Sequence, residues 1–152
     1  MWLVALWLTL FSPAGEGPQG TEGGAAMIRV TLTDEGPLPG GGHRLAFEVR
    51  NAGEAPARLC AYQTPFEGFL ADLLDVRDAQ GKRASYLGMS VKRGAPGESD
   101  HYVLAPGEAR VERFNLAEQY RLPASGAFTV QFKGNAALNA LPDSNVLTLT
   151  RP

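Results

Sequence analysis

The sequence predicts an all-β protein, an antiparallel β-sandwich of about seven to nine strands. From residue 28 onward apolar residues alternate with polar ones, as in Ile28, Val30 and Leu32. A period of two is typical of strands with one buried face. Glycine and proline contribute 18 and 11 of the 152 residues and gather between the alternating stretches, where they favour turns. This composition argues against a helical bundle.

Several stretches have the strand pattern, and turn-forming segments such as GPLPGGG and NAGEAP separate them. The expected strands are residues 28–33, 45–50, 57–62, 73–78, 83–88, 101–104, 109–116, 128–133 and 145–150. Residues 115–121 have modest helical character, and we expect one helical turn there that crosses between two sheets.

The side chains on one face of each stretch form the predicted core. Burying such a side chain stabilises the fold by roughly 1.5–3 kcal/mol, against a conformational entropy cost of similar total size. The candidates are Ile28, Val30, Leu32, Leu45, Phe47, Val49, Leu59, Val76, Val111, Phe128, Val130 and Phe132. We expect Cys60 to pack as a small apolar residue, and Tyr120 to be buried with its hydroxyl bonded to nearby backbone.

Residues 1–26 are predicted to be a signal peptide followed by a flexible linker. The opening MWLVALWLTLF has no charge, and as a helix it would be about 16 Å long, too short for a bilayer core of about 30 Å. This length is typical of a secretory signal, although no Lys or Arg precedes Arg29. We expect a secreted or periplasmic protein with one domain, residues 27–152, and no stable membrane span. Alternatively, Met27 is the true start and the protein is cytoplasmic.

The composition offers little material for catalysis. The formal charge of −2 lacks the basic excess of a nucleic-acid-binding protein. One cysteine and two histidines, His43 and His101, match no metal-ligand spacing, so we expect no metal and no cofactor. Ser99, Asp100 and His101 are consecutive, and an extended chain cannot bring such neighbours into triad geometry. We expect a protein that is not an enzyme; an unrecognised enzyme would require His101 in a cleft with carboxylates.

Four segments between residues 64 and 128 are more distinctive: TPFEG, YLGMSVKR, DHYVLAPGE and NLAEQYRLPASGAF. Their order resembles the non-catalytic N-terminal domain, often a propeptide, of deuterolysin-type (aspzincin) metallopeptidases. The third segment departs from that pattern by one insertion, His101. The matching residues are Thr64, Pro65, Glu67, Gly68, Tyr86, Gly88, Lys92, Arg93, Asp100, Tyr102, Leu104, Pro106, Gly107, Glu108, Leu116, Tyr120, Ser125, Gly126 and Phe128.

The resemblance covers residues 28–150 and implies an immunoglobulin-like sandwich, export, and a surface that docks on a peptidase domain. The chain ends at TLTRP, where the zinc-binding catalytic domain of that family would begin, so the resemblance implies no peptidase activity here. VRNAGEAPARL and VLAPGEA also resemble bacterial intracellular proteinase-inhibitor domains of the same sandwich type. Both resemblances favour a metallopeptidase domain or another protein as the partner.

The predicted partner-binding residues lie in two loops and are Thr64, Pro65, Phe66, Glu67, Phe69, Lys92 and Arg93. If exposed, the two phenylalanines would form an apolar anchor, and the KRGAPGESD loop could insert into a cleft. In the alternative, the phenylalanines close the end of the sandwich and the second loop is a solvated connection.

The function predicted from these loops is that of a secreted, non-catalytic, protein-binding domain, a peptidase inhibitor or a detached propeptide-like domain. It requires loops 63–69 and 92–100 to lie at one end of the sandwich. Loops at opposite ends, with an apolar patch on a sheet face, would favour a structural or adhesive module that binds another protein or a glycan.

Overall fold

The computed structural model describes residues 25–152, so the predicted signal peptide and most of the linker lie outside the described residues. Over this range the chain forms eight strands in three antiparallel sheets, ordered β1–β2–β6, β3–β5 and β4–β7–β8. The strands are β1 Ile28–Leu38, β2 Gly42–Asn51, β3 Ala57–Cys60, β4 Leu74–Asp78, β5 His101–Leu104, β6 Ala109–Asn115, β7 Gly126–Phe132 and β8 Leu147–Arg151. The short helices are η1 Pro39–Gly41, η2 Pro65–Glu67, η3 Glu98–Asp100 and α1 Leu116–Gln119.

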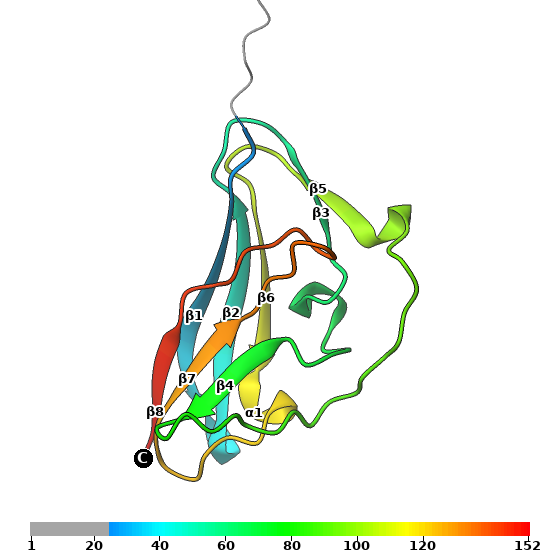
Figure 1. Cartoon of the computed structure of the whole chain (residues 1–152). Coiled ribbons are helices and arrows are strands. Elements are labelled where there is room, and N and C mark those ends of the chain that lie inside the picture. Colours follow the sequence, from blue (N-terminus) through cyan, green and yellow to red (C-terminus); the bar gives the residue numbers. More distant parts are fainter. Residues whose placement is uncertain (1–24) are drawn as a thin grey trace, which may run out of the picture.

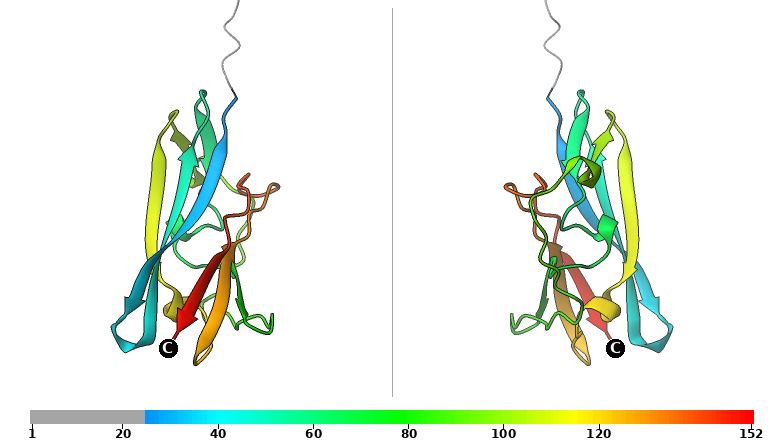
Figure 2. Two further views of the ribbon diagram at one scale, coloured as in Figure 1. Left: turned by 90° about the vertical axis from the view of Figure 1, so that its left-hand side faces the viewer. Right: turned by 90° about the vertical axis from the view of Figure 1, so that its right-hand side faces the viewer.

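Two of the sheets face each other and enclose the core (Figure 2). Sheet β4–β7–β8 covers the lower half of the long sheet β1–β2–β6 in Figure 1, while β3 and β5 lie beside its upper half. In immunoglobulin domains the first two strands share a sheet with a later strand, and the last two strands pair with an earlier one. The orders β1–β2–β6 and β4–β7–β8 follow that scheme. The predicted antiparallel sandwich is therefore confirmed.

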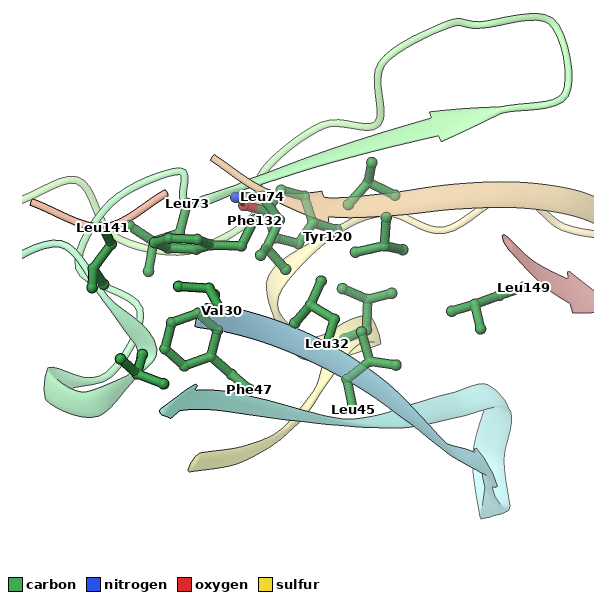
Figure 3. Close-up of a cluster of buried hydrophobic side chains, with 14 of the residues drawn as sticks. Val30, Leu32, Leu45, Phe47, Leu73, Leu74, Tyr120, Phe132, Leu141 and Leu149 are labelled. Carbon is green, nitrogen blue, oxygen red and sulfur yellow. Dashed lines mark hydrogen bonds between the residues drawn. The ribbon is translucent and has the colours of Figure 1, made fainter. Parts of the chain in front are cut away.

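The core fills the space between these two sheets (Figure 3). Leu45, Phe47 and Val49 of β2 are fully buried, as are Val130 and Phe132 of β7. All predicted core residues are buried except two. Ile28 is half-buried and packs against the edge of the core. The second exception is Val111.

The prediction for Val111 is wrong, because it assigned the wrong face of β6 to the core. Val111 is 38% exposed and pairs with Glu48 on the outer face of the sheet. The inner face of β6 instead carries Arg110, Glu112 and Phe114, which lie opposite buried residues of β2. A shift of one residue in register exchanges the two faces of a strand.

The strand predicted at residues 83–88 is also wrong. This segment forms only isolated bridges, between Arg83 and Arg77 and between Tyr86 and Tyr120. Its hydrogen-bond partners change along its length, because Ala84 N donates to Val76 O whereas Leu87 N donates to the α1 residue Gln119. The segment thus crosses from β4 to α1 and cannot extend one ladder.

Two side-chain amides define element ends near the sheets. The predicted helical turn is confirmed as α1, and Asn115 caps it by accepting from Ala117 N at 3.2 Å. The last strand starts later than predicted, because Asn145 uses its side chain to bond both Leu32 N and Leu32 O. Over residues 25–152, no helix has the length and apolarity needed to cross a bilayer.

Candidate functional site

Loop 63–69 is organised by Thr64, which is fully buried. Its hydroxyl donates to Ala61 O at 2.7 Å and accepts from Phe66 N at 3.2 Å, so it caps the short helix η2. Pro65 begins that helix and is buried as well. Gly68 ends it with a φ of 82°, a conformation that favours glycine. Thr64 and Pro65 therefore hold the loop in shape and present little side-chain surface to a partner.

The two phenylalanines of this loop pack against the rim of the core. Phe66 meets Phe47 edge to face, with ring centroids 5.1 Å apart. Phe69 meets Phe114 of β6 at 4.9 Å in the same manner. Both rings are half-buried, which fits their alternative role, closure of the sandwich, better than that of an exposed anchor.

Arg93 joins the two predicted loops. Its guanidinium forms ion pairs with Glu67 and with Asp100, the latter at 3.3 Å. It also lies 4.5 Å over the ring of Tyr62, whose hydroxyl donates to Gly94 O at 3.0 Å. Hydrogen bonding to Glu67 raises the pKa of Arg93. Arg93 and Glu67 thus fasten loop 92–100 to loop 63–69, so the two loops are in contact.

A second attachment lies a few residues earlier, at Tyr86. Its hydroxyl donates to Met89 O at 2.8 Å and lies 3.2 Å from Phe69 O. A Cβ atom at Gly88 would collide with the Tyr86 hydroxyl, so this turn needs glycine. The ring of Tyr86 also packs beside that of Tyr120, with centroids 5.4 Å apart.

Tyr120 connects this region to the opposite sheet. Its hydroxyl accepts from Leu74 N of β4 at 2.9 Å and donates to Asp72 at 2.7 Å. Burial, with the Asp72 carboxylate, raises the pKa of Tyr120. Tyr120 is buried as predicted, but its backbone partner lies 46 residues away along the chain, not nearby.

Between the attachments at Tyr86 and Arg93, residues 87–92 form what we call the apolar segment. Leu87, Met89 and Val91 are 49%, 66% and 43% exposed. Lys92 is exposed beside them. The segment belongs to residues 79–97, which contain no named strand or helix and run along the outside of the molecule from β4 to η3 (Figure 1). Long connections without secondary structure are uncommon in compact domains and are often functional. The strand predicted over residues 83–88 includes only Leu87 of this row, and the exposed row as a whole is not predicted from the sequence.

The two histidines have separate hydrogen-bond partners. His43 Nε2 lies 2.6 Å from Asp34 Oδ1, and His101 Nδ1 lies 2.8 Å from Gly97 O. Asp100 accepts from Gly97 N at 2.7 Å. Within residues 25–152, His, Cys, Asp and Glu side chains form no group of three that could hold a metal ion. Cys60 is buried, as predicted.

Tyr102 has a buried hydroxyl without a hydrogen-bond partner among residues 25–152. Burial raises its pKa to about 12. Its ring packs with Phe66 at 5.8 Å, and the Arg110 guanidinium lies 4.7 Å above it. The ring therefore acts through packing, without help from its hydroxyl.

Comparison with known proteins gives one weak similarity. No model of a known protein family matches the chain. Over 89 residues, or 59% of its length, the chain is 28% identical to a protein of Aeromonas hydrophila described as an extracellular protease. The alignment covers 25% of that protein. The similarity thus relates this β-sandwich to a fraction of a longer extracellular protease.

Proposed function

We propose that this protein is a secreted, non-catalytic β-sandwich domain that binds a peptidase through the apolar segment, as an inhibitor or a propeptide-like domain does. The observation that carries the proposal is the row formed by Leu87, Met89 and Val91 on the outside of a segment attached at both ends. Three neighbouring apolar side chains in water favour burial against another surface.

The attachments matter because binding costs conformational entropy. A free loop would lose that entropy when it docks, whereas a loop already held in place loses less. Tyr86 bonds Met89 O at the start of the segment, and Arg93 pairs with Glu67 at its end. Val91 N also donates to Leu70 O at 2.9 Å. The segment is thus presented in one conformation, as an extended recognition loop needs.

The choice of a peptidase rests on two similarities. The aligned protein of Aeromonas hydrophila is described as an extracellular protease. The TPFEG, YLGMSVKR and DHYVLAPGE segments resemble the non-catalytic domain of deuterolysin-type peptidases. Each of these three segments contains one of the residues that meet here, Glu67, Arg93 and Asp100.

The test is titration of the purified protein into a deuterolysin-type metallopeptidase, with calorimetry for binding and cleavage of a peptide substrate for inhibition. We expect a complex, and we expect Met89→Asp to weaken it at least about tenfold, because a charge would enter an apolar contact. Val146→Asp is the matched control, since Val146 is 56% exposed next to β8, and should leave binding unchanged.

Absence of a complex, or an equal loss of affinity in both variants, would overturn the proposal. Binding to another protein or a glycan, with no peptidase affinity, would instead support an adhesive module.

Export is a separate part of the proposal. Expression of the full chain in a bacterial host should place the protein outside the cytoplasm, with a mature N-terminus near residue 27. A cytoplasmic protein that retains Met1 would contradict export without affecting the binding result.

A further inference from the structure

β6 is an edge strand of the long sheet. Its ladder partner is β2, and Figure 2 shows it at the rim of the molecule. In the described part of the chain, no strand pairs with its other side. A free edge presents backbone N–H and C=O groups that can pair with another strand.

The pairing with β2 determines which backbone groups of β6 are free. Asn51 N donates to Glu108 O at 2.9 Å, so the carbonyl of Glu108 points toward β2, while Asn51 O accepts from Gly107 N at 2.7 Å. Because the backbone groups of successive residues in a strand point to opposite sides, those of Arg110 and Glu112 also point toward β2. Those of Ala109, Val111 and Arg113 therefore point outward.

Two side chains of opposite charge flank Val111 in β6. Arg110 precedes Val111 and Glu112 follows it. Both side chains lie on the inner face of the strand, and neither forms an ion pair within residues 25–152. Arg110 is held over the rings of Phe66 and Tyr102, at 4.6 and 4.7 Å, so its position is fixed.

We propose that β6 pairs with β6 of a second copy of this chain, antiparallel and about a two-fold axis at Val111. This register places Arg110 opposite Glu112 of the second copy and Glu112 opposite its Arg110. The exposed Val111 meets its own counterpart on the outer face. The outward backbone groups of Ala109 exchange hydrogen bonds with those of Arg113 of the second copy, and Val111 does so with its counterpart.

The occupant is a second copy because self-pairing in this register places Arg110 and Glu112 of each copy opposite a side chain of opposite charge. Directly opposite charged pairs of opposite sign stabilise antiparallel strands, whereas like charges destabilise them. A strand-edge contact of this length is smaller than a standard protein interface. The dimer is therefore concentration-dependent, and its dissociation constant is in the micromolar range or weaker.

Sedimentation of the purified protein over a wide concentration range tests the pairing. Wild-type protein should pass from monomer to dimer. Val111→Pro should weaken dimerisation about tenfold or more, because proline removes an outward N–H and edge strands tolerate it. Val103→Pro on β5 is the matched control. Val103 is 59% exposed, and Ala61 N donates to Asp100 O, so alternation places the Val103 N–H on the outer side of β5 as well. This variant should dimerise like wild type.

A charge exchange tests the register. Glu112→Arg places two arginines opposite each other and should leave the protein monomeric, whereas the double variant Arg110→Glu/Glu112→Arg restores opposite pairs and should dimerise again. Circular dichroism confirms that each variant is folded, and Glu112→Arg decides the outcome if the double variant does not fold. A wild-type protein that stays monomeric, or a dimer that Val111→Pro and Glu112→Arg leave intact, would overturn the inference.

Discussion

Phe47 of β2 and Phe132 of β7 meet edge to face across the sandwich, with ring centroids 4.8 Å apart and planes inclined by 61°. Both rings are fully buried (Figure 3). Antibody domains of this architecture join the equivalent second and sixth strands by a disulfide. Here an aromatic pair joins the two sheets at that level, and aromatic pairs in this geometry contribute about 0.5–1.5 kcal/mol beyond their buried area.

Replacement of Phe132 should therefore be among the most destabilising changes in the domain. We expect Phe132→Ala to lower the free energy of unfolding by about 3–5 kcal/mol, because it leaves a cavity and removes the pair with Phe47. Urea denaturation measures this change. Phe114→Ala, at the half-buried rim, is the control and should cost less; an equal loss in both variants would contradict a central role for the pair.

Two tyrosines allow a matched test of hydroxyl function. Tyr120→Phe should cost about 1–3 kcal/mol of stability, because it leaves Leu74 N without its acceptor in a buried position. Tyr102→Phe should be neutral or stabilising, because its buried hydroxyl lacks a partner among the described residues. Thermal or urea denaturation of both variants measures the difference. The reverse order of stabilities would show that the hydroxyl of Tyr102 is bonded after all.

Removal of Arg93 should loosen the end of the apolar segment. In Arg93→Met we expect faster hydrogen exchange at Val91, whose N–H bonds Leu70 O, because the attachment to Glu67 and Asp100 is lost. Arg58→Met is the control, since Arg58 pairs with a nearly fully exposed Glu98 and such surface pairs contribute little. Unchanged exchange at Val91 would show that Arg93 does not fasten the segment.

The hydrogen bond between Asp34 and His43 predicts that the stability of the domain depends on pH. Burial alone would raise the pKa of Asp34, but hydrogen bonds from His43 and from Gly36 N outweigh burial and lower it below 3.8. A carboxyl with a lowered pKa stabilises the folded state above its unfolded pKa, and this contribution disappears as the pH falls through the folded value. Asp34→Asn should therefore lose stability near neutral pH and approach wild type as the pH falls through the lowered pKa of Asp34.

Urea midpoints from neutral pH down to about pH 2 would measure the Asp34 effect across this window. The effect should be small, because the Asp34 side chain is 43% exposed and partly screened by solvent. A constant difference between the two proteins at every pH would contradict the assignment to ionisation.

The sequence predicts the fold best where one strand face is uniformly apolar, as in β1, β2 and β7. It fails in β6, because an inward position there is occupied by Arg110, which packs through its guanidinium on two aromatic rings. The alternation of apolar and polar residues does not reveal that an arginine packs on aromatic rings. It therefore predicts that Val111, not Arg110, faces the core. The loop residues Glu67 and Arg93 were predicted, but their contact spans 26 residues and depends on the fold. Leu87, Met89 and Val91 alternate with other residues as the apolar side chains of a strand do. The sequence does not indicate that these three side chains are exposed.

The chain contains a single cysteine, Cys60, and that thiol is buried. The cross-sheet contact between Phe47 and Phe132 forms by packing alone, so it needs no oxidant, no thiol exchange and no isomerase to sort partners. The described domain should consequently reach the same structure in glutathione-rich and in oxidising surroundings, and reductants such as dithiothreitol should leave its melting temperature unchanged.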